Sequence, residues 1–305
     1  EIKMDFSLSE ERKMLQETVA RFFENNYKDI KKRSDFLALN DGFSREIWKE
    51  SADLGVISGL ISPTFGGLGG TGEDFSIIFE LIGKSLCIEP FLSSGILSST
   101  ILSSIKNPKT ELINQIIDGE LLISFAHMEM NNRYEDHFVE TKAFLEDDNW
   151  KLNGSKSFVI NGDSADKVIV SARIDGEIND KNGIGLFLVD NNHITRRSYN
   201  TIDGYKAAEL NFDNVNAELL CKDDLALECI IKSNSAGALA LSAEAVGIMQ
   251  ICFDLTLEYL KTRKQFGKSI GAFQSIQHRM VDMMLEIEQV RSAVMIAAST
   301  FESNS

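Results

Sequence analysis

The sequence lacks several features that would each point to a definite class of protein. None of its apolar runs approaches the roughly 20 residues that a membrane-spanning helix needs, and its first thirty residues are charged, without a signal-peptide core. Cations are scarce as well, because 31 Lys and Arg stand against 46 Asp and Glu, for a net charge of −15. Such an acidic chain is a poor ligand for nucleic acids and anionic membranes. We therefore expect a cytoplasmic protein that binds neither nucleic acid nor a membrane.

Cysteine and histidine are also too few and too scattered to indicate a cross-linked or metal-binding fold. The four cysteines contain no Cys-x-x-Cys pair, and the four histidines are spread along the chain. Neither a disulfide framework nor a metal site is expected. With 43% hydrophobic and 25% charged residues, the composition is that of an ordinary globular protein.

Hydrophobic periodicity divides the 305 residues into three regions. Residues 1–118 carry apolar side chains at helical spacing and predict an all-α domain. Residues 119–225 consist of short apolar runs, and residues 226–305 return to helical spacing. The short runs are separated by Asn-Gly or Asp-Gly pairs at 153–154, 161–162, 175–176 and 182–183. This punctuation indicates a middle antiparallel β-domain, either a sheet or a barrel, so the predicted fold class is α+β.

The C-terminal region contains a long predicted helix with two apolar faces. One stripe contains Val246, Met249, Phe253, Leu257 and Leu260, and the other contains Leu241, Ile248, Ile251 and Leu255. Apolar residues on two faces predict a helix buried in a bundle rather than a surface helix.

A glycine-rich segment at residues 65–70 invites comparison with phosphate-binding loops. It lacks the Gly-Lys-Ser/Thr ending and does not follow a predicted strand with Gly-x-Gly-x-x-Gly spacing. A turn between two helices is the favoured interpretation, and a phosphate cradle is the alternative.

One compact basic segment in this acidic chain is a candidate anion site. Arg263, Lys264 and Lys268 follow the long predicted helix, beside Phe266 and Gly267. An arginine there can hold a diphosphate through charge-assisted hydrogen bonds of about 1.5–3 kcal/mol each. The alternative, which spacing alone favours, is a solvated charge run at a helix C-terminus, where cations suit the helix dipole.

Glu244 is a candidate general base because it falls on the second apolar stripe. Burial raises the pKa of a carboxyl group and suits it to proton abstraction near neutral pH. The favoured alternative is a buried structural glutamate that pairs with a helix end or with a cation such as Arg279.

Several motifs occur together in an informative order. They are Leu54-Gly55-Val56, Pro63, the glycine run at 65–70, Glu89-Pro90-Phe91-Leu92, residues 150–162, Phe212-Asp213-Asn214-Val215, Glu244-Ala245-Val246-Gly247, residues 263–268 and Phe273-Gln274. In this order and spacing the chain resembles the acyl-CoA dehydrogenase family over nearly its whole length. The resemblance implies an N-terminal helical domain, a middle β-domain and a C-terminal helical bundle that is incomplete here.

The resemblance also implies FAD, bound between the β-domain and the C-terminal helices at a dimer interface. Arg263 would hold the flavin diphosphate of the neighbouring subunit, with Phe266 and Gln274 around its adenosine part. Phe158 would cover the isoalloxazine ring, and the segment around Met128 would meet the ring and the acyl thioester.

The reaction that the resemblance implies is the α,β-dehydrogenation of an acyl-CoA in lipid metabolism. A carboxylate removes the α-proton, hydrogen bonds stabilise the enolate oxygen, and flavin N5 accepts the β-hydride. Electrons then leave to an electron-transfer flavoprotein. A flavin completed by a neighbouring subunit requires a homo- or hetero-oligomer, a dimer or a tetramer.

The chain departs from the family pattern at several cofactor and catalytic positions. Ile160 stands where the family usually has a hydroxyl residue that donates to flavin N5, and Met128 replaces another hydroxyl residue. Gly237 occupies the position of a glutamate that some members use as base, and in others the base would lie beyond Ser305. Glu244 lies two helical turns beyond Gly237, about 10 Å along the axis, and is the only candidate that the chain offers.

These departures leave three functional classes open. The leading hypothesis is an acyl-CoA dehydrogenase or a half-site subunit of one, which lends Arg263 and Gln274 to a partner's flavin. A flavin-dependent monooxygenase or oxidase of the same fold is one alternative. A non-catalytic acyl-CoA-binding subunit is the other.

Overall fold

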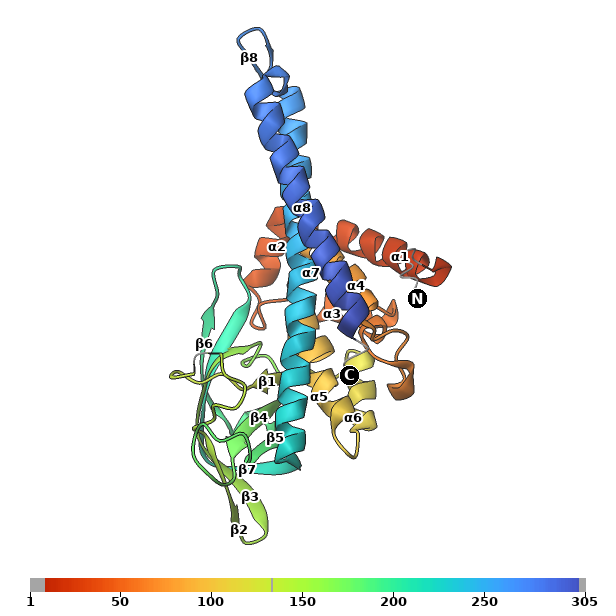
Figure 1. Ribbon diagram of the computed structural model, residues 1–305. Helices are drawn as coiled ribbons and strands as arrows, with labels where there is room; N and C mark the ends of the chain where they lie inside the picture. The colour runs from red at the N-terminus through yellow and green to blue at the C-terminus, as the bar shows by residue number, and fades with distance from the viewer. Residues whose placement is uncertain (1–8, 133, 302–305) are drawn as a thin grey trace, which may run out of the picture. The chain divides into compact units, whose positions relative to one another are not determined.

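The computed structural model describes residues 9–132 and 134–301, which divide into two compact units (Figure 1). The first, here called the barrel unit, comprises Ile30–Gly70 and Ile88–Gly237. The second, the helical unit, comprises Glu1–Asp29, Thr71–Cys87 and Ala238–Ser305.

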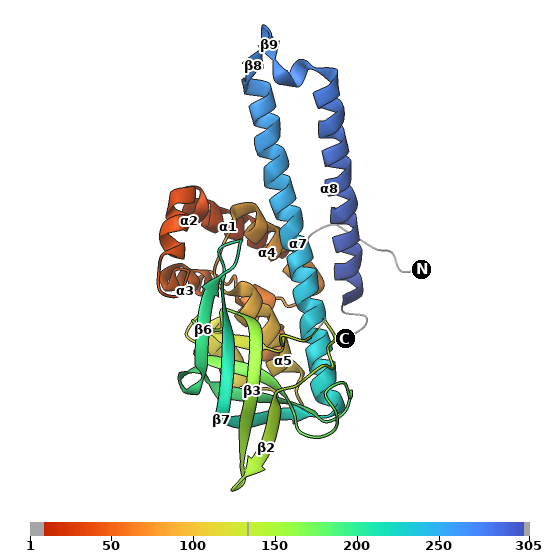
Figure 2. The same ribbon diagram turned by 90° about the vertical axis from the view of Figure 1, so that its left-hand side faces the viewer.

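The barrel unit is built on a seven-stranded sheet with the order β1-β4-β2-β3-β7-β5. Strand β5 also pairs with β4, so β4, β2, β3, β7 and β5 form a closed ring, and β6 pairs with β7 outside it (Figure 2). All pairs are antiparallel except β1–β4 and β2–β4, which are parallel. The strands are β1 (Ile123–Ala126), β2 (Lys142–Glu146), β3 (Asn149–Ile160), β4 (Lys167–Arg173), β5 (Ile184–Asp190), β6 (Thr195–Asn200) and β7 (Lys206–Lys222).

Strand β3 corrects one expectation drawn from the sequence. The Asn-Gly pair at 153–154 was predicted to be a turn, but it lies inside β3. The pairing of β3 with β7 shifts register between Leu152 and Gly154, and a Cβ on Gly154 would lie 2.7 Å from Thr141 Cα. The glycine therefore marks a bulge where another segment approaches closely, a role that the same residues can serve as readily as a turn.

Short helices complete the barrel unit. They are α2 (Ile30–Leu37), α3 (Arg45–Asp53), η1 (Ser58–Leu60), η2 (Pro63–Phe65), the π-helix η3 (Phe91–Ser98), α5 (Ser99–Ser104), α6 (Thr110–Ile117) and η4 (Asn191–His193). The glycine run follows η2 as a compact turn. The backbone N–H groups of Gly66, Gly67, Gly69 and Gly70 donate to carbonyls of residues 59–63. Because these donors are already used, the structure supports the turn rather than a phosphate cradle.

The helical unit contains α1 (Glu10–Tyr27), α4 (Gly72–Ser85), the short β8–β9 hairpin (Lys264–Gln265 and Lys268–Ser269), η5 (Ile270–Ala272) and α8 (Gln274–Phe301). It also contains most of α7 (Asp224–Thr262), which starts in the barrel unit. By length and composition alone α7 could cross a membrane. Core helices of globular proteins share both properties, so this is weak evidence for a membrane span.

Helices α4 and α7 approach each other closely at two glycines. A Cβ on Gly83 of α4 would lie 2.0 Å from the carbonyl oxygen of Glu244. A Cβ on Gly247 of α7 would lie 2.0 Å from the carbonyl oxygen of Glu80. Neither position can carry a side chain unless the helix backbones separate, which gives a packing reason for the glycine in the Glu244-Ala245-Val246-Gly247 motif.

We expect Gly247→Ala to destabilise the protein. Helix propensity alone would make the substitution stabilising by about 1 kcal/mol, whereas overpacking a helix contact costs about 1–3 kcal/mol. Denaturant unfolding measures the sign. Ala245→Gly, at an exposed position on the same helix, calibrates the propensity effect. A stabilised Gly247→Ala variant would show that the close approach does not constrain this position.

The two apolar stripes of α7 differ in burial. Val246 and Leu260 of the first stripe are buried, as predicted. In the second stripe Leu241, Ile248 and Leu255 are 48%, 36% and 60% exposed. The prediction that both faces are buried is therefore wrong for the single chain, in which these three side chains stay partly exposed.

Candidate active site

A cavity of about 240 Å³ lies in the barrel unit. Its walls come from η3, from β1 and the residues that follow it, from the end of β3, and from the first turns of α7. The lining residues are Ser93, Leu97, Phe125, His127, Met128, Tyr134, Phe158, Ile160 and Asn234. The fold therefore brings together Met128, Phe158 and Ile160, three of the residues predicted from the sequence to meet a flavin.

Phe158 is held in an uncommon backbone conformation. Its φ is 53°, and it lies where the pairing of β3 with β7 shifts register between Lys156 and Val159. A left-handed conformation in a bulky residue is strained, and such strain clusters at functional sites. The side chain is 50% exposed although it belongs to a barrel strand. The bulge thus presents an aromatic ring at the cavity instead of packing it in the core.

Ile160 and Met128 give the cavity apolar walls and no donor of their own. The Ile160 carbonyl accepts a 2.9 Å hydrogen bond from Ser124 Oγ, and the Met128 carbonyl accepts one of 2.8 Å from the backbone N–H of Ser157. These bonds fix the backbone on both sides of the cavity. Neither side chain can donate a hydrogen bond to a ligand.

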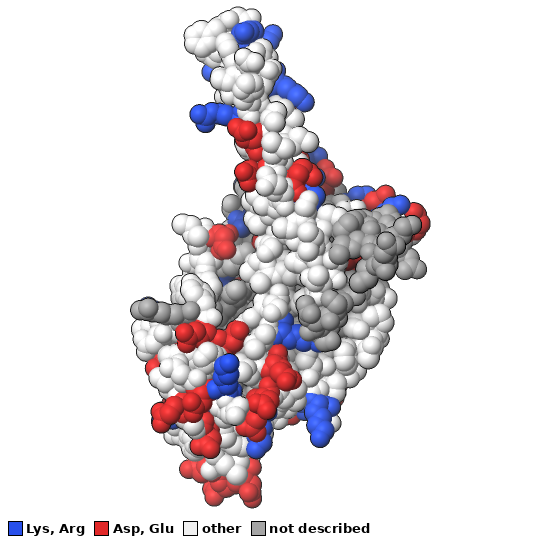
Figure 3. Space-filling model, viewed as in Figure 1, with Lys and Arg blue, Asp and Glu red and all other residues white. Residues whose placement is uncertain are grey.

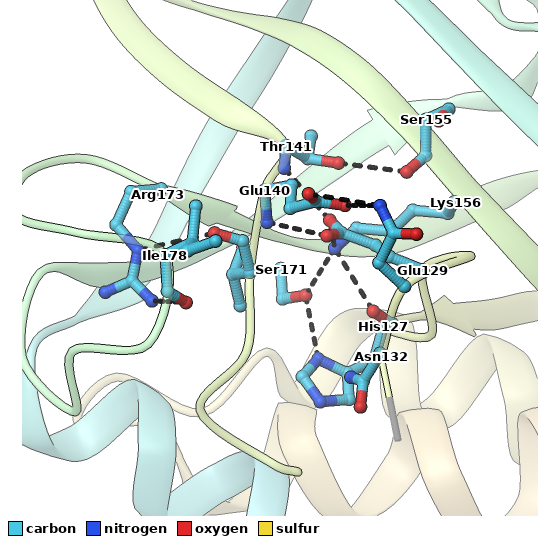
Figure 4. Close-up of polar contacts among 12 residues, drawn as sticks. His127, Glu129, Asn132, Glu140, Thr141, Ser155, Lys156, Ser171, Arg173 and Ile178 are labelled. Carbon is cyan, nitrogen blue, oxygen red and sulfur yellow. Dashed lines mark hydrogen bonds and ion pairs between the residues drawn. The ribbon is translucent and has the colours of Figure 1, made fainter. Parts of the chain in front are cut away.

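A buried ion pair lies next to the cavity (Figure 4). Lys156 Nζ donates to Glu129 Oε1 at 2.6 Å, to Ser171 Oγ at 2.9 Å and to the His127 carbonyl at 3.2 Å. Glu129 also accepts from the backbone N–H groups of Glu140 and Thr141 at 2.6 and 2.9 Å. Every proton of the ammonium group and both carboxylate oxygens are thereby satisfied.

Burial controls the protonation of this group of side chains. It lowers the pKa of Lys156 to about 8, although Glu129 acts in the opposite direction. Burial alone would raise the pKa of Glu129, but Lys156 and the N–H donors outweigh it and hold that pKa below its usual value. Burial, together with the charge of Lys156, lowers the pKa of His127 to about 3. His127 is therefore neutral at physiological pH.

Sequence reasoning missed this network, although one signal for it was present. Leu152 and Lys156, four residues apart on β3, are both fully buried. A lysine at an inward position of a strand requires a buried partner, but the sequence does not identify Glu129 as that partner.

Position 237 is a glycine and offers no carboxylate, and a side chain there would require Leu97 to change its rotamer. A Cβ on Gly237 would lie 2.7 Å from Leu97 Cδ2, and Leu97 itself lines the cavity. One turn earlier on α7, Asn234 Nδ2 donates to Asp136 Oδ1 at 2.6 Å. The side of α7 that faces the cavity therefore offers an amide and a glycine rather than a base.

Glu244 lies farther along α7, in the helical unit. Its side chain is partly buried, its backbone carbonyl packs on Gly83, and it is not among the residues that line the cavity. Its role as a base stays a prediction.

The basic segment forms the turn of the β8–β9 hairpin. Arg263 precedes β8, and no described residue accepts a hydrogen bond or ion pair from its guanidinium group. Phe266 is 90% exposed with a φ of 52°, and Gln274 is exposed at the start of α8. Lys and Arg side chains gather at this end of the molecule (Figure 3). The predicted diphosphate and adenosine contacts thus lie together on an exposed tip.

The comparison with known families follows the same division of the chain. Sequence models of the acyl-CoA dehydrogenase family match it in order: the N-terminal domain over residues 9–119, the middle domain over 124–215 and the C-terminal domain over 228–305. The chain belongs to the acyl-CoA dehydrogenase family. This confirms the predicted fold class and the resemblance seen in the sequence.

Individual relatives agree with this assignment. A probable acyl-CoA dehydrogenase of Bacillus subtilis, YngJ, is 29% identical over 308 residues, which cover 97% of this chain and 80% of the relative. The FAD complex of PigA superposes with a TM-score of 0.88 at 24% identity, covering 99% of this chain and 82% of that one. The ChsE4-ChsE5 complex of Mycobacterium tuberculosis gives a TM-score of 0.84 at 22% identity, covering 98% and 80%.

The family uses FAD, and the cavity walls fit a flavin ring in part. Phe125 and Phe158 are aromatic surfaces that suit a planar conjugated ring. Nε2 of His127, a buried nitrogen without a partner among the described residues, suits a polar atom on a ligand. Met128 and Ile160 stand where the resemblance implies hydroxyl donors, and neither side chain donates a hydrogen bond. The residues are therefore compatible with the ring but would hold it with fewer bonds.

Proposed function

We propose that this chain is a subunit of an FAD-dependent acyl-CoA dehydrogenase and that it completes a flavin site shared with a neighbouring subunit. The observation that carries the proposal is the unpaired Arg263 beside the exposed Phe266 at the tip of the β8–β9 hairpin. A guanidinium group and an aromatic ring that contact little of their own chain are suited to a diphosphate and an adenine on another one.

Residues in two parts of the chain, the β8–β9 hairpin region and the cavity of the barrel unit, would bind the cofactor and the substrate. Arg263 would hold a diphosphate by charge-assisted hydrogen bonds, and Gln274 would bind beside it. In the barrel unit Phe158 would cover the ring system, while Met128 and Ile160 exclude water from the acyl thioester. FAD, when bound, supplies the group that accepts a hydride from the β-carbon of the acyl chain.

The cavity lacks groups that the proposed reaction needs, whereas the β8–β9 hairpin region has the residues proposed to bind the cofactor. Ile160 cannot donate to flavin N5, which forfeits a hydrogen bond worth about 0.5–1.5 kcal/mol. Position 237 is a glycine, so a base would come from Glu244 or from outside the described residues. These features favour a half-site subunit over a self-sufficient enzyme. The ChsE4-ChsE5 complex, which has the same fold, gives a precedent for two different chains in one assembly.

The exposed stripe of α7 supports an oligomer. Leu241, Ile248 and Leu255 face outward from a helix that is buried on its other side. Contiguous apolar surface of this kind marks a protein interface. We propose that a second subunit covers it, that the assembly is cytoplasmic, and that an electron-transfer flavoprotein accepts its electrons.

The test is the flavin content of the purified assembly, read from its visible absorption spectrum, with and without Arg263→Ala. We expect the variant to retain flavin at least about tenfold less tightly, because charge-assisted bonds to a diphosphate are lost. Arg21→Ala, which removes an exposed guanidinium group on α1, should leave flavin content unchanged.

Other outcomes separate the remaining functions. Unchanged flavin content in Arg263→Ala would refute the shared site. Flavin bound by this chain alone and bleached by an acyl-CoA would show a self-sufficient enzyme. Oxygen consumption without an electron-transferring protein would indicate an oxidase or monooxygenase. Binding of a CoA thioester without flavin would indicate a non-catalytic subunit.

A further inference from the structure

The hydrogen bonds of the buried network indicate which ring nitrogen of His127 carries the proton. An ammonium group has three protons, and Lys156 directs them to the His127 carbonyl, Glu129 and Ser171 Oγ. Ser171 Oγ therefore accepts from Lys156 and lies 2.9 Å from Nδ1 of His127. If this hydroxyl also accepted from Nδ1–H, its own proton would have no acceptor among the described residues, whereas donation to Nδ1 uses it. A ring nitrogen that accepts a hydrogen bond carries no proton, so the proton of the neutral imidazole is on Nε2.

The ring is also fixed in orientation. It stacks on Phe125 with 5.7 Å between ring centroids and 7° between planes. The charged groups that face it are Lys156 and Glu129, and the nearby ammonium group disfavours a second proton on the ring. Figure 4 shows Nδ1 directed at Ser171 and the other ring nitrogen directed away from the network. His127 is thus held as a neutral ring with a fixed N–H donor.

This donor has no partner among the described residues. Nε2 is buried, and the ring to which it belongs lines the cavity. Two other polar side chains that line the cavity donate hydrogen bonds to protein acceptors. Ser93 Oγ donates to Asn161 Oδ1, and Asn234 Nδ2 donates to Asp136 Oδ1. A buried donor left without an acceptor costs about 1–3 kcal/mol, so native proteins rarely keep one without a purpose.

We propose that His127 Nε2–H is a ligand-binding group that donates to a carbonyl oxygen of the molecule that fills this cavity. The proposal rests on the function proposed above, under which two molecules can supply that oxygen: the flavin ring and the acyl thioester. A fixed neutral donor suits an oxygen on which negative charge develops, because it needs no reorganisation as the charge grows. It also supplies a hydrogen-bond donor to a cavity in which the side chains at positions 128 and 160 have none.

The position of the proton is tested by nitrogen-15 NMR of the imidazole rings in the ligand-free protein. The chain has four histidines, and loss of one signal in His127→Phe assigns the resonance. At pH 6.5, below the Lys156 pKa of about 8, we expect a neutral ring with its proton on Nε2. Ser171→Ala should remove this preference and give a mixture of tautomers. A proton on Nδ1, or a charged ring, would overturn the inference whatever the ligands do.

The ligand is identified by adding free FAD and butanoyl-CoA separately to the assembly. The molecule that supplies the oxygen should shift the Nε2–H resonance, and His127→Phe should weaken its binding by about three- to tenfold, the range for one neutral hydrogen bond. His127→Gln, which can place an amide N–H near the position of Nε2, should recover most of the affinity, whereas His127→Asn should not.

Failure of the inference about His127 can be distinguished from failure of the proposed function. Binding of either molecule by calorimetry, without a shift of Nε2–H and without an effect of His127→Phe, would refute the inference and leave the proposed function standing. Binding of neither molecule would count against both.

Discussion

Lys156→Met is expected to destabilise the protein by about 3–5 kcal/mol. Methionine has nearly the length of lysine and fills the same space, but it leaves the Glu129 carboxylate without its cation in a site where both side chains are at most 2% exposed. An unpaired buried charge is among the most costly changes a protein can carry. Denaturant unfolding followed by circular dichroism measures the loss.

Two further variants make this result interpretable. Lys142→Met makes the same chemical change on the exposed face of β2 and should alter stability by less than about 0.5 kcal/mol. The double variant Lys156→Met with Glu129→Leu removes both charges and should recover much of the loss, because apolar replacement of a whole buried pair is often neutral. A stable Lys156→Met variant, or a double variant no better than the single one, would show that the pair is not the source of the effect.

Stability is expected to fall as the pH drops from 6.5 towards 3 because of His127. Its pKa is about 3 in the folded protein and 6.5 in the unfolded chain. The unfolded chain therefore binds more protons in this interval, and acid favours unfolding. At about 1.4 kcal/mol per pH unit, the full interval gives an upper limit of about 4–5 kcal/mol.

The interval between pH 6.5 and 4.5 isolates this effect from that of the neighbouring carboxylate. Glu129 has its pKa lowered from 4.5, so the stability that it contributes is lost only at lower pH, as the carboxylate is protonated. Denaturant midpoints measured across the upper interval should fall in the native protein and stay nearly level in His127→Gln. His278→Gln, on the exposed surface of α8, should behave as the native protein does. Equal slopes in all three proteins would refute the assignment.

The fold could be predicted from the sequence because the patterns that indicate it are local. Helical spacing and Asn-Gly punctuation indicated helices, a β-domain and again helices, and the ordered motifs identified the family. The error at Asn153-Gly154 has a local cause, since the pair that makes a hairpin turn also makes a bulge, and only the partner strand decides which forms. The predicted domain limits at 118 and 225 lie near the end of α6 and the start of α7, but the division into domains stays a prediction.

Only some residues of the candidate site could be predicted from the sequence. Met128, Phe158 and Ile160 were found through the family motifs, and the structure places them around one cavity. The orphaned nitrogen of His127 could not be predicted, because its tautomer depends on Ser171, which comes from a strand more than forty residues away. The contact between Leu97 and position 237 likewise depends on packing between distant segments.

The ion pair beside the cavity also bears on the order in which the barrel unit folds. Lys156 comes from β3, Glu129 from the segment after β1, and Ser171 from β4, so the three meet only when distant strands have come together. Burying an ammonium group before its acceptors are in place is costly, so we expect this contact to form late, after the transition state of folding. Interactions formed after the barrier slow unfolding more than they speed folding. Lys156, Glu129 and Ser171 should therefore slow the unfolding of the barrel unit.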